Sequence, residues 1–146
     1  MRTVKQISAF LENKPGQLME FTKVLCDNNI DMRSLCLSEA AEFGIVRVIV
    51  DNAEKAVEAL KKAGYICAVT PVIAAIVPDR PGGLYSVLKM LSDEGVNIEY
   101  NYVFLGKKKD GAYNIFHVEQ ACTDKAFECL KRGGIEIVTQ EELDNL

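Results

Sequence analysis

The sequence of 146 residues has one histidine, no tryptophan and no apolar run near the roughly 18 residues that a membrane-spanning helix needs. With a single imidazole, the chain has little with which to build a histidine metal site or a catalytic dyad. That residue, His117, falls at an outward position of a predicted strand, which favours an ordinary surface residue. Residues 1–6 lack the basic start, apolar stretch and cleavage site of a signal peptide. These absences predict a cytoplasmic protein that makes no membrane contact and is not an enzyme.

Charge and hydrophobic content narrow the class of protein further. The net charge is −4 and the basic residues are spread along the chain, so the sequence lacks the basic patch that nucleic-acid binding requires. Hydrophobic residues make up 49% of the chain, which excludes disorder. This apolar content suffices for the core of one ordinary domain or of two very small ones.

Five cysteines are present, an odd number, and none belongs to a Cys-x-x-Cys motif. Cys26, Cys67 and Cys129 lie among apolar neighbours in predicted helices or strands, where a reduced cysteine acts as a small hydrophobic residue. The pattern predicts free thiols, and it favours neither a metal site nor a cofactor.

The chain repeats itself. Residues 13–18 (Asn-Lys-Pro-Gly-Gln-Leu) match residues 79–84 (Asp-Arg-Pro-Gly-Gly-Leu) at an offset of 66. Residues 55–64 match residues 125–134 at an offset of 70, and we assign the four extra residues to a turn at residues 106–111. A period this long exceeds that of solenoid repeats and predicts two copies of one small domain. The two predicted domains are residues 1–70 and residues 71–146.

Periodicity predicts the same element order, βαββαβ, in each copy. In the second helix of the first copy, Glu58 and Lys62 form an i,i+4 pair on the outer face, and Glu128 and Arg132 are expected to form the matching pair. The strands are expected at residues 6–11, 31–38, 44–50, 65–69, 72–77, 97–105, 112–119 and 135–138.

This order predicts an α+β fold of two tandem ferredoxin-like domains, each an antiparallel sheet with both helices on one face. No linker rich in glycine or serine separates the copies, so they should be tightly coupled. The topology hosts many functions and does not by itself identify one. Neither third strand carries the basic, aromatic motif of an RNA-recognition domain.

The positive functional signal is the Asx-basic-Pro-Gly loop before the first helix of each copy. The proline fixes φ, and the glycine lets a ligand or another backbone approach closely. The helix that follows presents free N–H groups and the positive end of its dipole, which suit a carboxylate. Asn13 and Asp79 offer oxygen atoms that could accept hydrogen bonds from an ammonium group. Together these groups describe a site for a free amino acid, and a capped turn without ligand is the alternative.

The pair of βαββαβ repeats resembles the ACT domain family over nearly the whole chain. The resemblance is carried by the Asx-basic-Pro-Gly-x-Leu loop of each copy, by residues 42–47, by the strand start at residues 96–100 and by the end at residues 141–143. These segments look like those of small stand-alone tandem-ACT proteins. The resemblance implies a regulatory module, usually amino-acid-binding, that pairs side by side into an eight-stranded sheet and is normally attached to a metabolic enzyme.

Within one repeat, the loop and the start of the second strand lie at opposite ends of a helix, roughly 18 Å apart, so one repeat cannot form the site alone. Pairing of the repeats about a pseudo-twofold axis would bring each loop beside the other repeat's strand start. The resemblance assigns ligand contacts to the side chains of Asn13 and Asn97 and to the amides of residues 16–18. The first expected site comprises Asn13, Lys14, Pro15, Gly16, Gln17, Leu18, Asn97 and Ile98. The second comprises Asp79, Arg80, Pro81, Gly82, Gly83, Leu84, Asp31 and Met32.

We expect the two sites to be unequally occupied, because the second brings the carboxylates of Asp79 and Asp31 near one ligand ammonium. The leading hypothesis is a regulatory sensor that binds a free amino acid, forms a homodimer and acts on a metabolic enzyme. The alternative is an interaction or structural module whose loop site is empty. The alternating aromatic residues of one predicted strand fit either core packing or an aromatic ligand wall. They are Tyr100, Tyr102 and Phe104.

Overall fold

The structure, a computed structural model, describes residues 2–39, 41–104, 106 and 111–146. Contacts divide the chain into two compact units, Lys5–Thr70 and Pro71–Asp144, and residues 2–4 pack with the second unit. Each unit has the βαββαβ order of a ferredoxin-like domain, so the α+β prediction is confirmed.

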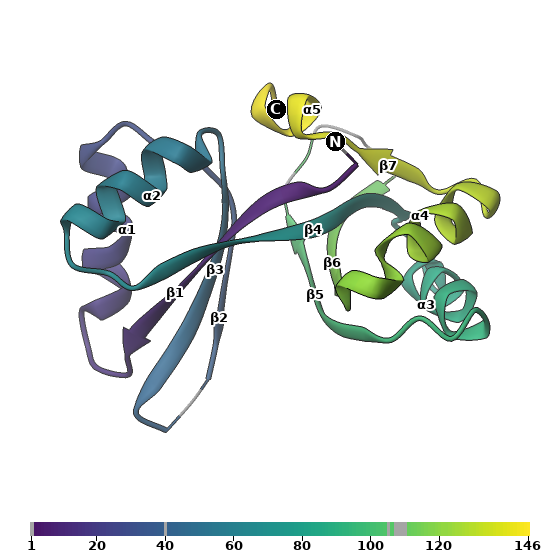
Figure 1. The fold of residues 1–146 in the computed structure, drawn as a ribbon, viewed down its shortest axis with the longest axis horizontal. Helices are drawn as coiled ribbons and strands as arrows, with labels where there is room; N and C mark the ends of the chain where they lie inside the picture. Colours follow the sequence, from purple (N-terminus) through teal and green to yellow (C-terminus); the bar gives the residue numbers. More distant parts are fainter. Residues whose placement is uncertain (1, 40, 105, 107–110) are drawn as a thin grey trace. The chain divides into compact units, whose positions relative to one another are not determined.

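The first unit is a sheet of strand order β2-β3-β1-β4 with both helices on one face (Figure 1). Strand β3 pairs antiparallel with both β1 and β2. The core between sheet and helices contains Ile7, Val48, Phe21, Leu25 and Leu60, each at most 1% exposed. The elements are β1 (Val4–Glu12), α1 (Gln17–Asp27), β2 (Met32–Ser38), β3 (Phe43–Val50), α2 (Ala53–Lys62) and the first part of β4 (Cys67–Pro78).

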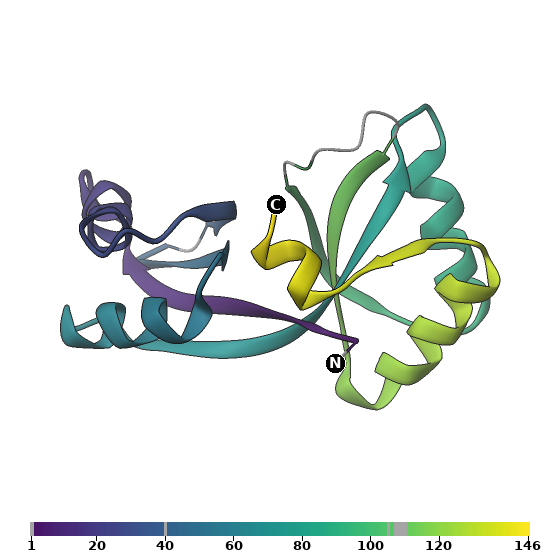
Figure 2. The same cartoon turned by 90° about the horizontal axis from the view of Figure 1, so that it is seen from above.

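The second unit repeats this plan with strand order β7-β4-β6-β5. Two of its helices, α3 and α4, lie on the same side of the sheet (Figure 2). Its core contains Ile73, Phe116, Val87, Leu91 and Leu130, again almost fully buried. After β4 come α3 (Gly83–Asp93), β5 (Ile98–Phe104), β6 (Gly111–Val118), α4 (Thr123–Arg132) and β7 (Glu136–Val138).

Strand β4 belongs to both units. Its first residues close the sheet of the first repeat, and the residues after Pro71 form the first strand of the second repeat. The expected strands at 65–69 and 72–77 are therefore one strand. The sequence predicted eight strands, four in each repeat. The described residues form seven, because β4 serves as the last strand of the first repeat and the first strand of the second.

The registers locate the four extra residues of the second repeat. Ile7 pairs with Val48 and Ile73 pairs with Phe116, so β3 corresponds to β6 at an offset of 68. Two of the extra residues thus lie after β6, where a 3₁₀ helix (Gln120–Cys122) precedes α4. The assignment of all four residues to the turn at 106–111 was wrong. Of that turn, residues 107–110 lie outside the described residues.

A fifth helix, α5 (Gln140–Asp144), follows β7 and was not expected. Its start is a reciprocal capping box: the Glu142 amide donates to Oγ1 of Thr139 (3.2 Å), and the Thr139 amide donates to Oε2 of Glu142 (2.7 Å). Leu143 on this helix is fully buried. None of the helices formed by the described residues is long and apolar enough to cross a membrane.

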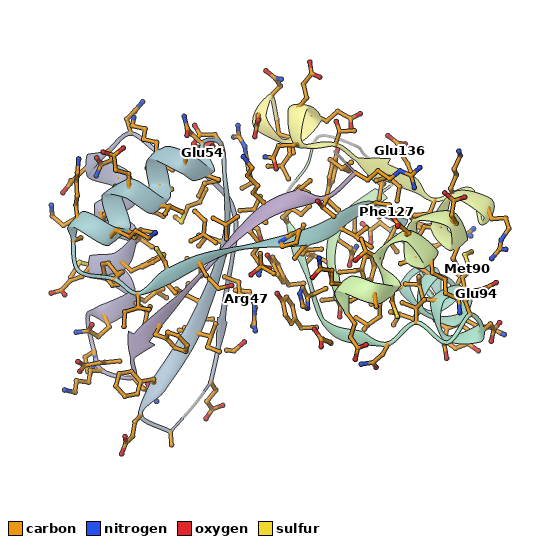
Figure 3. The ribbon with its side chains drawn as sticks, in the orientation of Figure 1. Arg47, Glu54, Met90, Glu94, Phe127 and Glu136 are labelled. Atoms are coloured by element: carbon orange, nitrogen blue, oxygen red, sulfur yellow. The ribbon has the colours of Figure 1, made fainter. Side chains whose placement is uncertain are left out.

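One of the two ion pairs predicted on the helix surfaces is confirmed. Glu58 and Lys62 pair at 2.9 Å, as expected, and the salt bridge lowers the pKa of Glu58. The pairing of Glu128 with Arg132 was wrong, because each has a nearer partner on another segment. Glu128 pairs with Arg2 at 3.2 Å, and Arg132 pairs at 2.5 Å with Glu94, the residue that follows α3. Figure 3 labels Glu94 in the second unit.

The described cysteines are all free thiols. Cys129 is buried, and its thiol donates to the Met90 carbonyl at 3.3 Å. Cys67 is half-buried, and burial raises the pKa of its thiol, so it stays protonated at neutral pH. Cys26 is exposed on α1, so the expectation that it packs among apolar neighbours was wrong.

Candidate ligand-binding site

The two Pro-Gly loops have the same backbone conformation. In each, the amide of the basic residue donates to the carbonyl two residues earlier, and the helix begins with one i−3 and one i−4 hydrogen bond. In the first loop, the amides of Lys14, Gln17 and Glu20 donate to the carbonyls of Glu12 (3.0 Å), Lys14 (3.3 Å) and Gly16 (2.9 Å). In the second, Arg80, Gly83 and Ser86 donate to Pro78 (3.1 Å), Arg80 (2.9 Å) and Gly82 (3.0 Å).

Gly16 and Gly82 precede their helices in the left-handed region, with φ of +86° and +80°. No atom would lie within 4 Å of a Cβ at either position. Residues with a Cβ rarely adopt this left-handed backbone conformation. The conformation itself is therefore the reason that glycine is required at both positions. Among the described residues no other backbone approaches these two glycines closely, and the approach of a ligand to them stays a prediction.

The close approach occurs one residue later, and only in the second loop. A Cβ on Gly83 would lie 1.9 Å from the carbonyl oxygen of Pro78. The corresponding residue of the first loop is Gln17, whose backbone has room for a side chain. Position 83 at the start of α3 therefore has no room for a side chain, whereas position 17 at the start of α1 carries one.

A pocket of about 190 Å³ lies at the first loop, entirely within the first unit. It is smaller than the ~300–1,000 Å³ typical of sites for drug-sized ligands, and its size suits a small metabolite. Four of the predicted site residues line it: Asn13, Lys14, Gln17 and Leu18. Pro15 and Gly16 shape the loop but do not line the pocket.

The remaining lining residues come from three strand ends and were not predicted. The strand topology explains their position: β1 ends where the antiparallel β3 begins, and the Asn13 amide donates to the Glu42 carbonyl at 2.9 Å. The connection from β2 to β3 therefore lies beside the loop. The residues that sequence reasoning missed are Leu11, Glu12, Leu37, Ser38, Glu39 and Gly44.

The pocket has a carboxylate and a cation side by side on its rim. Nζ of Lys14 lies 2.7 Å from Oε2 of Glu12, and this hydrogen bond and charge raise the pKa of Lys14. Both side chains are exposed, so the pair contributes little to stability. The pair instead affects the charge at the rim of the pocket, because the ammonium group of Lys14 offsets the negative charge of Glu12.

The start of α1 provides donors beside the pocket. The Gln17 amide is used within the loop, but among the described residues the amides of Leu18 and Met19 have no backbone acceptor. They are the unpaired first-turn donors of a helix of 11 residues, and they lie at the positive end of its dipole. This arrangement can bind a carboxylate.

The two predicted strand starts lie at the far ends of their helices from the loops, as expected. Asp31 follows α1, and its carboxylate pairs with Arg33 at 2.5 Å, which neutralises one charge of the second predicted site. Met32 begins β2 and pairs with Val50. In the second unit Asn97 is exposed, and Ile98 pairs with Val118 and packs against the core.

His117 lies on the face of the sheet opposite the core, as the alternation predicted, because Phe116 and Val118 on either side of it belong to the core, but its side chain is only 21% exposed. Nδ1 of its ring lies 2.5 Å from Oε2 of Glu99, and the ring stacks on Tyr100 with 4.7 Å between centroids. Tyr100 stacks in turn on Tyr102 at 6.5 Å. These contacts favour packing as the role of the aromatic residues. No group of three or more potential metal ligands occurs in the described ranges of the chain.

Comparison with known proteins identifies the fold family. The family described as ACT domain pair matches residues 2–146. The chain belongs to the ACT domain pair family. ACT domains are regulatory rather than catalytic. No curated protein is significantly similar to the chain.

Solved structures agree with this family. The chain is 39% identical to protein BT0572 from Bacteroides thetaiotaomicron, with a TM-score of 0.89 over 99% of this chain and 98% of that one. The ligand-free regulatory subunit of aspartate kinase from Thermus thermophilus is 17% identical, with a TM-score of 0.65 over 88% and 91% of the two chains. The corresponding subunit from Thermus flavus is 15% identical, with a TM-score of 0.61 over 88% and 90%. The two subunits share the fold of this ACT domain pair.

Proposed function

We propose that this ACT domain pair is a regulatory sensor that binds a free amino acid at the loop of residues 13–18. The observation that carries the proposal is the pocket, which combines Asn13, the unpaired amide of Leu18 and an apolar interior, and the unpaired amide of Met19 follows next on α1. An amino acid has a carboxylate, an ammonium group and a side chain, and each has a complementary group here. The carboxylate would lie at the start of α1 and the ammonium group at the Asn13 side-chain oxygen.

The proposal includes Asn97 and Ile98 of the second repeat as the other wall of the site. Helix α1 separates the loop from the strand start of its own repeat, so the second wall must come from another repeat. By the same reasoning, the loop of residues 79–84 would face Asp31 and Met32. We propose that the first site is the one occupied, because the close packing of Gly83 leaves the second loop less room.

Signalling requires that the amino acid bind one assembly state better than another. We propose a homodimer as that assembly and a metabolic enzyme as the regulated partner. The alternative function is a protein-interaction module without a ligand. One observation favours it: Phe10 and Phe43, on neighbouring strands β1 and β3, are 55% and 52% exposed.

A thermal-shift screen of the twenty amino acids separates these functions. A ligand at about 100 times its Kd stabilises the native state by about 2.7 kcal/mol, which raises Tm by several degrees. We expect at least one amino acid to do so at millimolar concentration. The D-enantiomer of the same amino acid is the control, because its groups cannot all reach their partners at once. If no amino acid raises Tm, the interaction module is the better account.

A further inference from the structure

The interior of the pocket at residues 13–18 is aliphatic. Leu11 is 3% exposed and lies directly across the ladder from Gly44, on the side of the sheet that faces the helices. Leu18 packs against the same core from α1, and Leu37 forms a third wall from the edge strand β2. A ligand side chain entering here would therefore exchange water for hydrocarbon on three sides.

The pocket extends to the backbone at Gly44. A Cβ at this position would lie 3.0 Å from the Ser38 carbonyl oxygen and 3.1 Å from Cδ1 of Leu37, which is tighter than normal packing. A methyl group at position 44 would therefore fit between β3 and the wall that Leu37 forms only if Leu37 and the Ser38 carbonyl moved by a few tenths of an ångström.

The charges at the rim disfavour an ionised ligand side chain. Two carboxylates, Glu12 and Glu39, line the pocket with one cation, Lys14, which is already paired with Glu12. An acidic side chain would meet an excess of negative charge. A basic side chain could pair with Glu39 only at the rim; inside the pocket its charge would lie against leucine residues, which is unfavourable.

The second repeat differs at the positions that shape this space. In the second repeat Val77 pairs with Ala112, and in the first repeat the corresponding pair is Leu11 and Gly44. Alanine therefore occupies the position that corresponds to Gly44. The second repeat carries at Ala112 the methyl group that Gly44 lacks.

We propose that the pocket selects amino acids with uncharged aliphatic side chains, from valine to leucine, isoleucine and methionine in size, and that the Leu37 wall beside Gly44 sets the upper limit. The inference rests on the proposed function and adds the class of ligand. Each methylene group of the ligand that is buried should raise its affinity about fourfold.

Calorimetry of the full chain with alanine, valine, leucine, lysine and glutamate tests the inference. We expect affinity to rise from alanine to leucine, with glutamate and lysine at least tenfold weaker than leucine. In the variant Gly44→Ala, leucine should lose at least tenfold in affinity while alanine loses little, because the added methyl group displaces the Leu37 wall that a longer ligand side chain would contact. The variant Leu37→Ala, at an exposed wall, should improve phenylalanine relative to leucine.

The outcomes separate this inference from the proposed function. If lysine or glutamate binds more tightly than leucine, the aliphatic assignment is wrong although the amino-acid sensor stands. If Gly44→Ala and Leu37→Ala both leave the ranking of ligands unchanged, the pocket does not hold the side chain. If no amino acid binds, the proposed function itself fails.

Discussion

Replacing Gly83 with alanine is expected to destabilise the second unit by about 3 kcal/mol, at the upper end of the usual cost of overpacking. The added methyl group would lie 1.9 Å from the Pro78 carbonyl oxygen, a backbone atom that cannot move without displacing β4 or the start of α3. Gly83 is buried, so the methyl group cannot turn toward solvent. Amide hydrogen exchange measures the effect, because Val87 and Leu91 in α3 should lose protection first.

Gln17→Ala is the matched control for Gly83→Ala. It lies at the corresponding position of the first loop, which already accommodates a side chain, and it should change stability by less than about 0.5 kcal/mol. If the amides of α3 exchange equally slowly in Gly83→Ala and in Gln17→Ala, the close packing at Gly83 is not a feature of the protein in solution.

Replacing Asn13 with alanine is expected to weaken binding of the amino acid between about 10-fold and 100-fold. In our proposal the side-chain oxygen of Asn13 accepts a hydrogen bond from the ligand ammonium group, and a hydrogen bond to a charged group contributes about 1.5–3 kcal/mol. The variant should fold normally, because Asn13 is exposed and its backbone amide keeps its bond to Glu42. Calorimetric titration with the amino acid that gives the largest thermal shift measures the loss.

Asp79→Ala is the corresponding change in the second loop, and it should alter the affinity less than twofold. If instead Asp79→Ala weakens binding and Asn13→Ala does not, the ligand occupies the second loop. The unequal use of the two loops would then be reversed, although binding of an amino acid would still hold.

Local sequence patterns were sufficient to predict most of the fold. The internal repeat and the alternation of apolar residues gave the element order, and the Pro-Gly motif gave the start of α1 and α3. The capping box Thr139-x-x-Glu142 is a sequence signal from which the start of α5 could have been predicted. The continuity of β4 was harder to predict, because a proline commonly interrupts a strand and Pro71 lies within β4.

The loop residues that line the pocket could be predicted from the sequence, but the strand residues that form its walls could not. Leu37, Glu39 and Gly44 are distant from residues 13–18 in the sequence, and only the β1–β3 register brings them beside the loop. In the second loop the close approach of a backbone occurs at Gly83, one residue after the glycine at which it was expected. A Pro-Gly-Gly sequence does not reveal which glycine is required for its φ, as Gly82 is, and which for space, as Gly83 is.

Nuclear magnetic resonance titration of uniformly ¹⁵N-labelled protein with leucine tests the central claim most directly. We expect the backbone amides of Leu18 and Met19 and the side-chain amide of Asn13 to shift in a saturable way. The corresponding amides of Leu84 and Tyr85 should shift much less. Saturable shifts of those second-loop amides alone, or no saturable shift at either loop with any of the twenty amino acids, would contradict it.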